Sequence, residues 1–135
     1  MMSGLIHDKS MDFAIRIVKL CRFLRSERQE YEICNQLIRS GTAIGALQRE
    51  AEHAESMPDF IHKFAIAQKE CNETLYWLEL LFKTDCLTKE QYDSLNNDAR
   101  LLMALITRSL KTAKQSILTS PYHSTTLTTL PHENK

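Results

Sequence analysis

Two short stretches, EAEH at 50–53 and DFIH at 59–62, place a carboxylate and a histidine three residues apart. Glu-x-x-His pairs on facing helices can bind two metal ions in the core of a helix bundle. In the helices predicted below, however, these side chains turn away from the apolar stripes, and the neighbouring helices offer no matching ligands. We therefore expect no metal site and interpret both stretches as solvated polar faces.

The stretch SGTAIG at 40–45 holds two of the three glycines and raises the question of a phosphate-binding loop. Such a loop follows a strand, and its nucleotide-binding form has Lys-Ser or Lys-Thr after the glycines. This stretch instead lies within an apolar period of helical spacing. Each glycine costs a helix roughly 1 kcal/mol relative to alanine. We therefore predict that Gly41 and Gly45, on one side of a helix, form a packing seam that a neighbouring helix approaches closely.

The four cysteines at positions 21, 34, 71 and 86 are widely separated and form no C-x-x-C pair. No apolar run typical of a signal peptide occurs near the N-terminus, so a reducing, cytoplasmic location is expected. No Ser-His-Asp or Cys-His arrangement stands out. We assign no catalytic residue and expect no cofactor and no small-molecule substrate.

The length and the net charge limit which classes of protein are possible. A chain of 135 residues is one domain, large enough for an apolar core without a metal or a disulfide. Basic and acidic residues number 17 each, so the net charge is zero and gives no overall attraction for nucleic acid or an anionic membrane. No stretch approaches the roughly 20 apolar residues of a membrane span.

Apolar residues recur at steps of three and four, which predicts long amphipathic helices and no strands. The predicted helices span about residues 11–28, 31–55, 57–83 and 89–118. They are flanked by an N-terminal extension, 1–9, and by a flexible tail rich in Thr and Pro, 119–135. Capping signals begin two helices, at Ser56 with Asp59 and at Thr88 with Gln91. Four helices with short links predict an all-α fold, an antiparallel up-down-up-down four-helix bundle.

In the predicted hairpin between helices 31–55 and 57–83, residues at equal distances from the turn lie side by side. The hairpin places Arg39 beside Glu73 and Glu50 beside Lys63, and we predict an ion pair at each level.

The helix at 57–83 has more apolar residues than one core-facing stripe requires. In LYWLELLF at 75–82, every residue except Glu79 is apolar. The helix at 11–28 shows a weaker form of the same excess. An exposed apolar patch usually marks an interface, so we predict a homo-oligomer with the interface residues Ile15, Val18, Ile66, Tyr76, Trp77 and Leu80. Alternatively, the helices are rotated from this assignment, or the C-terminal tail covers Trp77.

Basic residues recur at every third position of the helix at 11–28: Arg16, Lys19, Arg22, Arg25 and Arg28. Contacts to phosphate add up in affinity, and an oligomer would multiply them, so this stripe is a candidate RNA-binding surface. The alternative is that these side chains are solvated or pair with acidic residues of the helix at 31–55.

The segment from Gln36 to Phe82 resembles the bacterial four-helix-bundle proteins named for the protein encoded in 23S ribosomal RNA intervening sequences. The motifs that carry the resemblance are IRSGTAIGALQREAEHAES and DFIHKFAIAQKECNETLYWLELL. The resemblance implies a small, cytoplasmic, non-enzymatic protein that forms a homopentamer. A more distant relative by fold, the accessory protein of diversity-generating retroelements, is a pentamer that works with nucleic acid. Leu47 and Gln48 depart from the family pattern, which commonly has an asparagine and then an apolar residue there.

Three functions are therefore to be compared. The favoured one is a non-enzymatic, homo-oligomeric scaffold whose partner is itself. The second is an RNA- or ribonucleoprotein-binding accessory protein that uses the basic helix at 11–28. The least favoured is a metal-binding or enzymatic bundle built on Glu50, His53 and His62.

Overall fold

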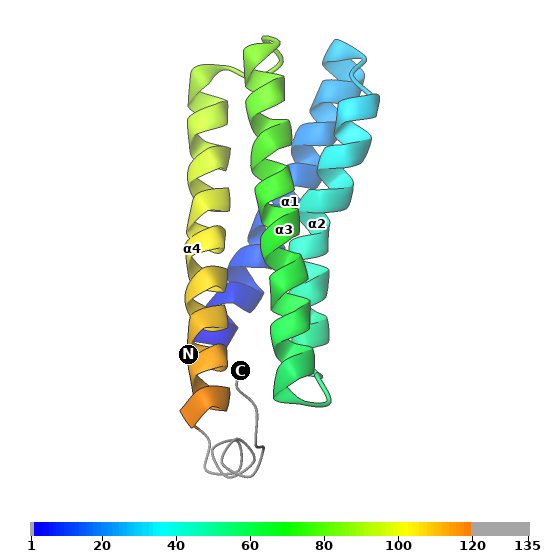
Figure 1. Cartoon of the computed structure of the whole chain (residues 1–135). Coiled ribbons are helices and arrows are strands. Elements are labelled where there is room, and N and C mark those ends of the chain that lie inside the picture. The colour runs from blue at the N-terminus through cyan, green and yellow to red at the C-terminus, as the bar shows by residue number, and fades with distance from the viewer. Residues whose placement is uncertain (1, 120–135) are drawn as a thin grey trace, which may run out of the picture.

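Residues 2–119 form four α-helices, drawn in Figure 1. The computed structural model describes residues 2–119, and no strand occurs among them. The helices are α1 (Met2–Arg28), α2 (Glu32–Glu52), α3 (Met57–Lys83) and α4 (Lys89–Thr119). The prediction of an all-α, four-helix protein is confirmed. The tail predicted from residue 119 on lies, apart from Thr119, outside the described residues.

The predicted start of the first helix was wrong. α1 begins at Met2 rather than near residue 11, so residues 2–9 of the expected extension are helical. The physical reason is a continuation of the core-facing spacing: Ile6, Ser10, Phe13 and Ile17 are all buried. Ser10, which we expected outside the helix, lies inside it, and its hydroxyl donates to the carbonyl of His7 at 3.2 Å. α2 ends at Glu52, three residues before its predicted end.

Capping residues explain where α3 and α4 begin. The Ser56 hydroxyl accepts a hydrogen bond from the Asp59 backbone N–H at 3.2 Å. Thr88 and Gln91 bond reciprocally, backbone N–H to side-chain oxygen in each direction, at 2.9 and 3.1 Å. Both arrangements supply partners to N–H groups that the first helical turn leaves unpaired.

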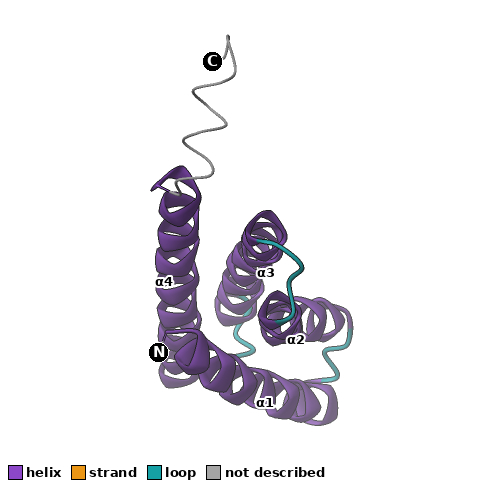
Figure 2. Cartoon of the chain, turned by 90° about the horizontal axis from the view of Figure 1, so that it is seen from below, coloured by secondary structure: helices purple, strands orange, loops and turns teal. Residues whose placement is uncertain are grey.

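The helices pack in a cycle, α1 on α2, α2 on α3, α3 on α4 and α4 on α1. Consecutive helices run in opposite directions, and α1 is inclined relative to the other three, as Figures 1 and 2 show. Within residues 2–119, α1 and α3 do not pack side by side, nor do α2 and α4. One core runs through all four helices; its largest fully buried side chains include Phe13, Ile17, Phe64, Leu78 and Ile106.

The glycine seam of α2 faces α1. A Cβ atom added to Gly41 would lie 3.2 Å from both Cγ1 and Cγ2 of Ile17, and one added to Gly45 would lie 3.3 Å from Oγ of Ser10. The two glycines therefore permit the close approach of α1, which identifies the helix that packs against the seam.

A buried polar contact joins α2 to α3. The hydroxyl groups of Ser40 and Thr74 lie 2.9 Å apart, and both side chains are fully buried. Thr74 also reaches the carbonyl of Glu70, at 2.8 Å. Because a buried hydroxyl without a partner is costly, this contact favours one register of α2 against α3. None of the four helices is long and apolar enough to cross a membrane.

Candidate interaction surface

The outward side of α3 carries an exposed aromatic pair. Tyr76 is 56% exposed, and its ring lies edge-on to that of the partly buried Trp77, with centroids 4.9 Å apart. The indole N–H of Trp77 donates to Oε2 of Glu73 at 2.9 Å, which fixes the orientation of the indole. We call Glu73, Tyr76 and Trp77 the α3 surface. The other α3 interface candidates, Ile66 and Leu80, are partly buried.

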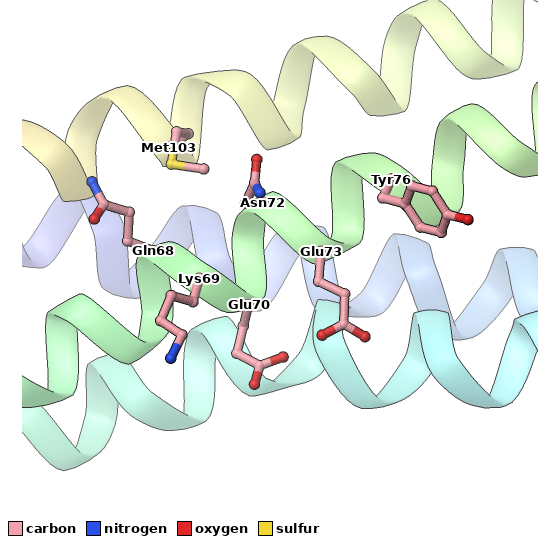
Figure 3. A pocket seen from close by; sticks show the side chains of 7 residues that line it. All are labelled: Gln68, Lys69, Glu70, Asn72, Glu73, Tyr76 and Met103. Atoms are coloured by element: carbon pink, nitrogen blue, oxygen red, sulfur yellow. The ribbon is translucent and has the colours of Figure 1, made fainter.

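Two grooves flank this aromatic pair. The larger has a volume of about 770 Å³ and is lined by Met103 of α4 and six residues of α3: Gln68, Lys69, Glu70, Asn72, Glu73 and Tyr76. Figure 3 shows Glu70 and Glu73 on the side of α3 that faces α2, and Gln68 and Asn72 on the side that faces α4. The second groove, of about 390 Å³, lies between Trp77 and the beginning of α2.

Arg39 of α2 anchors the acidic side of this region. Its guanidinium donates to Oε1 of Glu70 at 3.1 Å and also to Glu73, so Glu73 accepts from both Arg39 and Trp77. At the other end of the hairpin, Nζ of Lys63 lies 2.9 Å from Oε1 of Glu50, and this hydrogen bond raises the pKa of Lys63. The structure thus brings together both ion pairs expected from the hairpin.

The apolar candidates of α1 lie on a different part of the molecule. Ile15 is 44% exposed, and Val18 is partly buried. Sequence reasoning missed Phe23, which is 46% exposed. A rotation of 100° per residue places Phe23 away from the core-facing stripe, and this signal could have found it. We call Ile15, Phe23 and the exposed Lys19 and Arg22 the α1 surface.

The predicted interface residues lie on two separate parts of the bundle. Because α1 and α3 occupy diagonal positions in the cycle of helices, the candidates on α1 and those on α3 cannot merge. Figure 2 shows the two helices on different sides of the bundle. The described chain therefore presents two separate surfaces.

Of the five basic side chains in the stripe of α1, two form hydrogen bonds to neighbouring helices and three are exposed. The Arg16 guanidinium donates to Asp98 at 2.5 Å and to Ser94 at 3.0 Å, both on α4. Arg25 donates to the Asn35 side chain of α2 at 2.6 Å. The remaining members, Lys19, Arg22 and Arg28, are exposed.

The candidate metal ligands and the cysteine thiols do not form a metal site or a nucleophilic site in the part of the chain that the structure describes. Residues 2–119 contain no group of three or more His, Cys, Asp or Glu side chains placed to hold a metal ion. Glu50 is paired with Lys63, and the Asp59 carboxylate accepts from the Glu55 backbone N–H. Burial raises the pKa of the Cys21 and Cys71 thiols to about 12, which makes them poor nucleophiles.

Residues 5–108 match the family model of the 23S rRNA-intervening sequence proteins. The chain belongs to this family. The resemblance seen in the sequence is thereby confirmed, and the matched residues include both surfaces.

A solved member of similar sequence supports the fold. The crystal structure of a protein of unknown function from the S23 ribosomal protein family of Bacteroides thetaiotaomicron VPI-5482 is 50% identical, with a TM-score of 0.81. The alignment covers 82% of this chain and 99% of that one. No curated protein matches this chain.

Gln48, one of the two departures from the pattern expected of 23S rRNA-intervening sequence proteins, takes part in a polar network. Its side chain is buried, and its Nε2 donates to Oε2 of Glu52 at 2.8 Å. Nδ1 of His7 lies 2.6 Å from the same oxygen. The hydrogen bond from Gln48, followed by that from His7, lowers the pKa of Glu52. Gln48 thus helps to connect the beginning of α1 to the end of α2, whereas Leu47 is partly buried against the core.

Proposed function

We propose that this 23S rRNA-intervening sequence protein is a non-enzymatic cytoplasmic scaffold that assembles from copies of itself. The observation that carries the proposal is the exposed Tyr76, which lies against an indole that Glu73 holds in place. Oriented aromatic side chains dominate the energetics of many protein interfaces, because they bury a large apolar area at a small entropic cost. The family resemblance suggests five subunits. The cytoplasmic location is supported by the four cysteines, which are all free thiols.

Sedimentation velocity over a range of protein concentrations tests this function. We expect the wild type to sediment as an oligomer and Tyr76→Glu to dissociate it, because the substitution would bury a carboxylate without a partner. Tyr76 projects outward, so this variant should keep the helical circular dichroism of the wild type. Thr112→Glu adds the same charge at an exposed position of α4 and should leave the oligomer intact. A wild type that stays monomeric at every concentration refutes the proposal.

RNA binding through α1 is the second candidate function. The observation that favours it is the exposure of Lys19, Arg22 and Arg28 along one helix, close to the exposed Phe23. Cationic side chains beside an aromatic ring are typical of surfaces that bind single-stranded nucleic acid. The triple substitution of Lys19, Arg22 and Arg28 by Gln should weaken binding of a single-stranded RNA oligonucleotide and reduce the dependence of the affinity on salt. Arg16→Gln is the control, because Arg16 is bonded to α4. Unchanged binding by the triple variant excludes this surface.

A further inference from the structure

Three of the four cysteines lie at one end of the bundle. Cys21 is near the end of α1, Cys34 is near the beginning of α2, and Cys86 is in the loop between α3 and α4. Because consecutive helices run in opposite directions, the α1–α2 loop and the α3–α4 loop are at the same end (Figure 1). The thiol of Cys71 instead donates to the carbonyl of Ala99 at 3.2 Å, and burial alone raises its pKa, so it lies apart from the other three.

Cys21 and Cys34 face each other across the interface between α1 and α2. The Cys21 sulfur lies 3.7 Å from the carbonyl oxygen of Cys34, and the Cys34 sulfur lies 4.0 Å from the carbonyl oxygen of Cys21. The two thiols also hydrogen-bond each other. Each sulfur thus lies beside the main chain of the other residue, where the same two helices pack closely along the glycine seam. A disulfide, which requires closely spaced α carbons, can form here with little movement of the backbone.

The third thiol connects this buried pair to solvent. Cys21 and Cys34 are fully buried, whereas Cys86 is partly exposed. Burial raises the pKa of Cys34, and Cys86 is near enough for its charge to raise this pKa further. Burial also raises the pKa of Cys21 to about 12. Since the thiolate is the reactive form of a cysteine, an oxidant should react first at Cys86 and only afterwards with the buried pair.

We propose that Cys86, Cys34 and Cys21 form an oxidation site for small hydroperoxides, in which oxidation at Cys86 passes to the buried pair and ends as a Cys21–Cys34 disulfide. With hydrogen peroxide, the Cys86 thiolate attacks one oxygen and the O–O bond breaks. Cys86 becomes a sulfenic acid, and the other oxygen leaves as hydroxide, which takes up the proton that Cys86 released.

Two exchanges then move the oxidation inward. Cys34 attacks the sulfenic sulfur, and the leaving hydroxide takes the Cys34 proton, so a Cys34–Cys86 disulfide and water form. Cys21 next attacks the Cys34 sulfur, the bond to Cys86 breaks, and Cys86 takes the Cys21 proton and is again a thiol. In sum, two thiols are oxidised to one disulfide, and one hydrogen peroxide is reduced to two water molecules.

The disulfide would fasten α1 to α2. Because both buried thiols are slow nucleophiles, the site is modified once per chain rather than acting as a catalyst. The bond joins residues 13 positions apart on helices that already pack together, so it restricts the unfolded chain more than the folded one. Oxidation should therefore stabilise the bundle. This change takes place within one chain and does not depend on the proposed self-assembly.

Peptide mapping of the whole protein tests the site. The reduced protein is treated with one molar equivalent of hydrogen peroxide, the remaining thiols are alkylated in denaturant, and tryptic peptides are identified by mass spectrometry. Trypsin releases Cys21 in LCR and Cys34 in QEYEICNQLIR, so the proposed disulfide gives one diagnostic linked peptide. We expect this link in the wild type. The midpoint of thermal unfolding should rise by roughly 5–10 °C, and dithiothreitol should reverse the rise.

Three serine variants test the route of the oxidation. Cys71→Ser is the matched control, because it changes a buried thiol outside the group, and it should form the link as the wild type does. Cys86→Ser should lack the link at the time when the wild type has formed it, because the exposed thiol is gone. Cys21→Ser should stop at the intermediate, with Cys34 linked to Cys86.

Two results would overturn the proposal. One is a wild-type map without the link between LCR and QEYEICNQLIR, whether the thiols stay reduced or Cys86 links only to Cys86 of another molecule. The other is a Cys86→Ser protein that forms the link as fast as the wild type. The wild-type map needs no variant, so it decides the first question even if a serine in the core disturbs the fold.

Discussion

Gly41 of α2 lies against Ile17 of α1 so closely that a methyl group at position 41 would lie 3.2 Å from both γ carbons of the isoleucine. Ile17 is fully buried, and its branched side chain has little freedom to move. The contact explains why a helix with a well-buried face keeps a residue that lowers its helical propensity.

Gly41→Ala should therefore destabilise the fold even though alanine favours helix. Overpacking costs about 1–3 kcal/mol, and the gain in helix propensity offsets roughly 1 kcal/mol of it. We expect a net loss of about 1 kcal/mol in the free energy of unfolding, measured by urea denaturation. Gly45→Ala is the matched control. Its methyl group would meet one atom tightly, the Ser10 hydroxyl oxygen at 3.3 Å, instead of two carbon atoms at 3.2 Å. The gain in helix propensity should offset this smaller overlap, so the free energy of unfolding should stay close to that of the wild type. A more stable Gly41→Ala protein would contradict this account of the seam.

Thr74→Val should cost about 1–2 kcal/mol of stability, because it leaves the Ser40 hydroxyl buried without the partner it has in the native fold. Adding Ser40→Ala should recover part of the loss, since two apolar groups replace a hydrogen-bonded pair. Urea denaturation of both single variants and the double variant measures this coupling. Strict additivity of the two losses would show that the hydroxyl groups do not depend on each other.

The acid sensitivity of the fold should depend on Glu52. Its pKa is lowered from the ordinary value of 4.5 in the folded state by the hydrogen bonds from Gln48 and His7. A lowered folded-state pKa stabilises the fold at pH values above 4.5, and this contribution is lost as the pH falls through the folded-state pKa. Glu52→Gln should therefore flatten the fall in stability between roughly pH 5 and pH 3. An unchanged slope in urea titrations over this range would contradict the assignment.

One thiol per chain should react quickly with a chromogenic aromatic disulfide in the folded protein. Cys86 is partly exposed, whereas Cys21, Cys34 and Cys71 are buried, and burial raises the pKa of each of these three thiols. All four should react after unfolding. The Cys86→Ser variant should lose the fast phase. A fast phase that remains in this variant would show that the bundle opens and exposes one of the three buried thiols.

Helix positions were predicted best where the sequence contains local signals. α3 was predicted at its observed bounds because Ser56 and Asp59 cap its first turn and the apolar spacing runs on to Phe82. The start of α1 was missed because Ser10 was interpreted as a boundary, although Ile6 already continued the core-facing spacing. A serine at a helical position is ambiguous until its burial is known.

The candidate surfaces were predicted only in part. Periodicity showed that Tyr76 and Ile15 turn away from the core-facing stripes of their helices, and both are exposed. Periodicity could not show that the exposed apolar residues of α1 and those of α3 lie on different parts of the bundle, because that depends on which helices pack side by side. Likewise, the spacing of arginines is the same for Arg16 as for Arg22, but only the structure pairs Arg16 with Asp98.

The seam at Gly41 has a consequence for the shape of any assembly. α1 spans 27 residues, or ~40 Å, and it crosses α2 at this close contact. α1 also carries the exposed Ile15 and Phe23, so it would lie at any contact between copies that uses these side chains. A change in its inclination would turn every subunit relative to its neighbour by the same angle, and this repeated angle sets the curvature of the assembly. Side chains at the seam would thus help to determine how many subunits close a ring, although they lie inside the bundle and touch no neighbouring subunit.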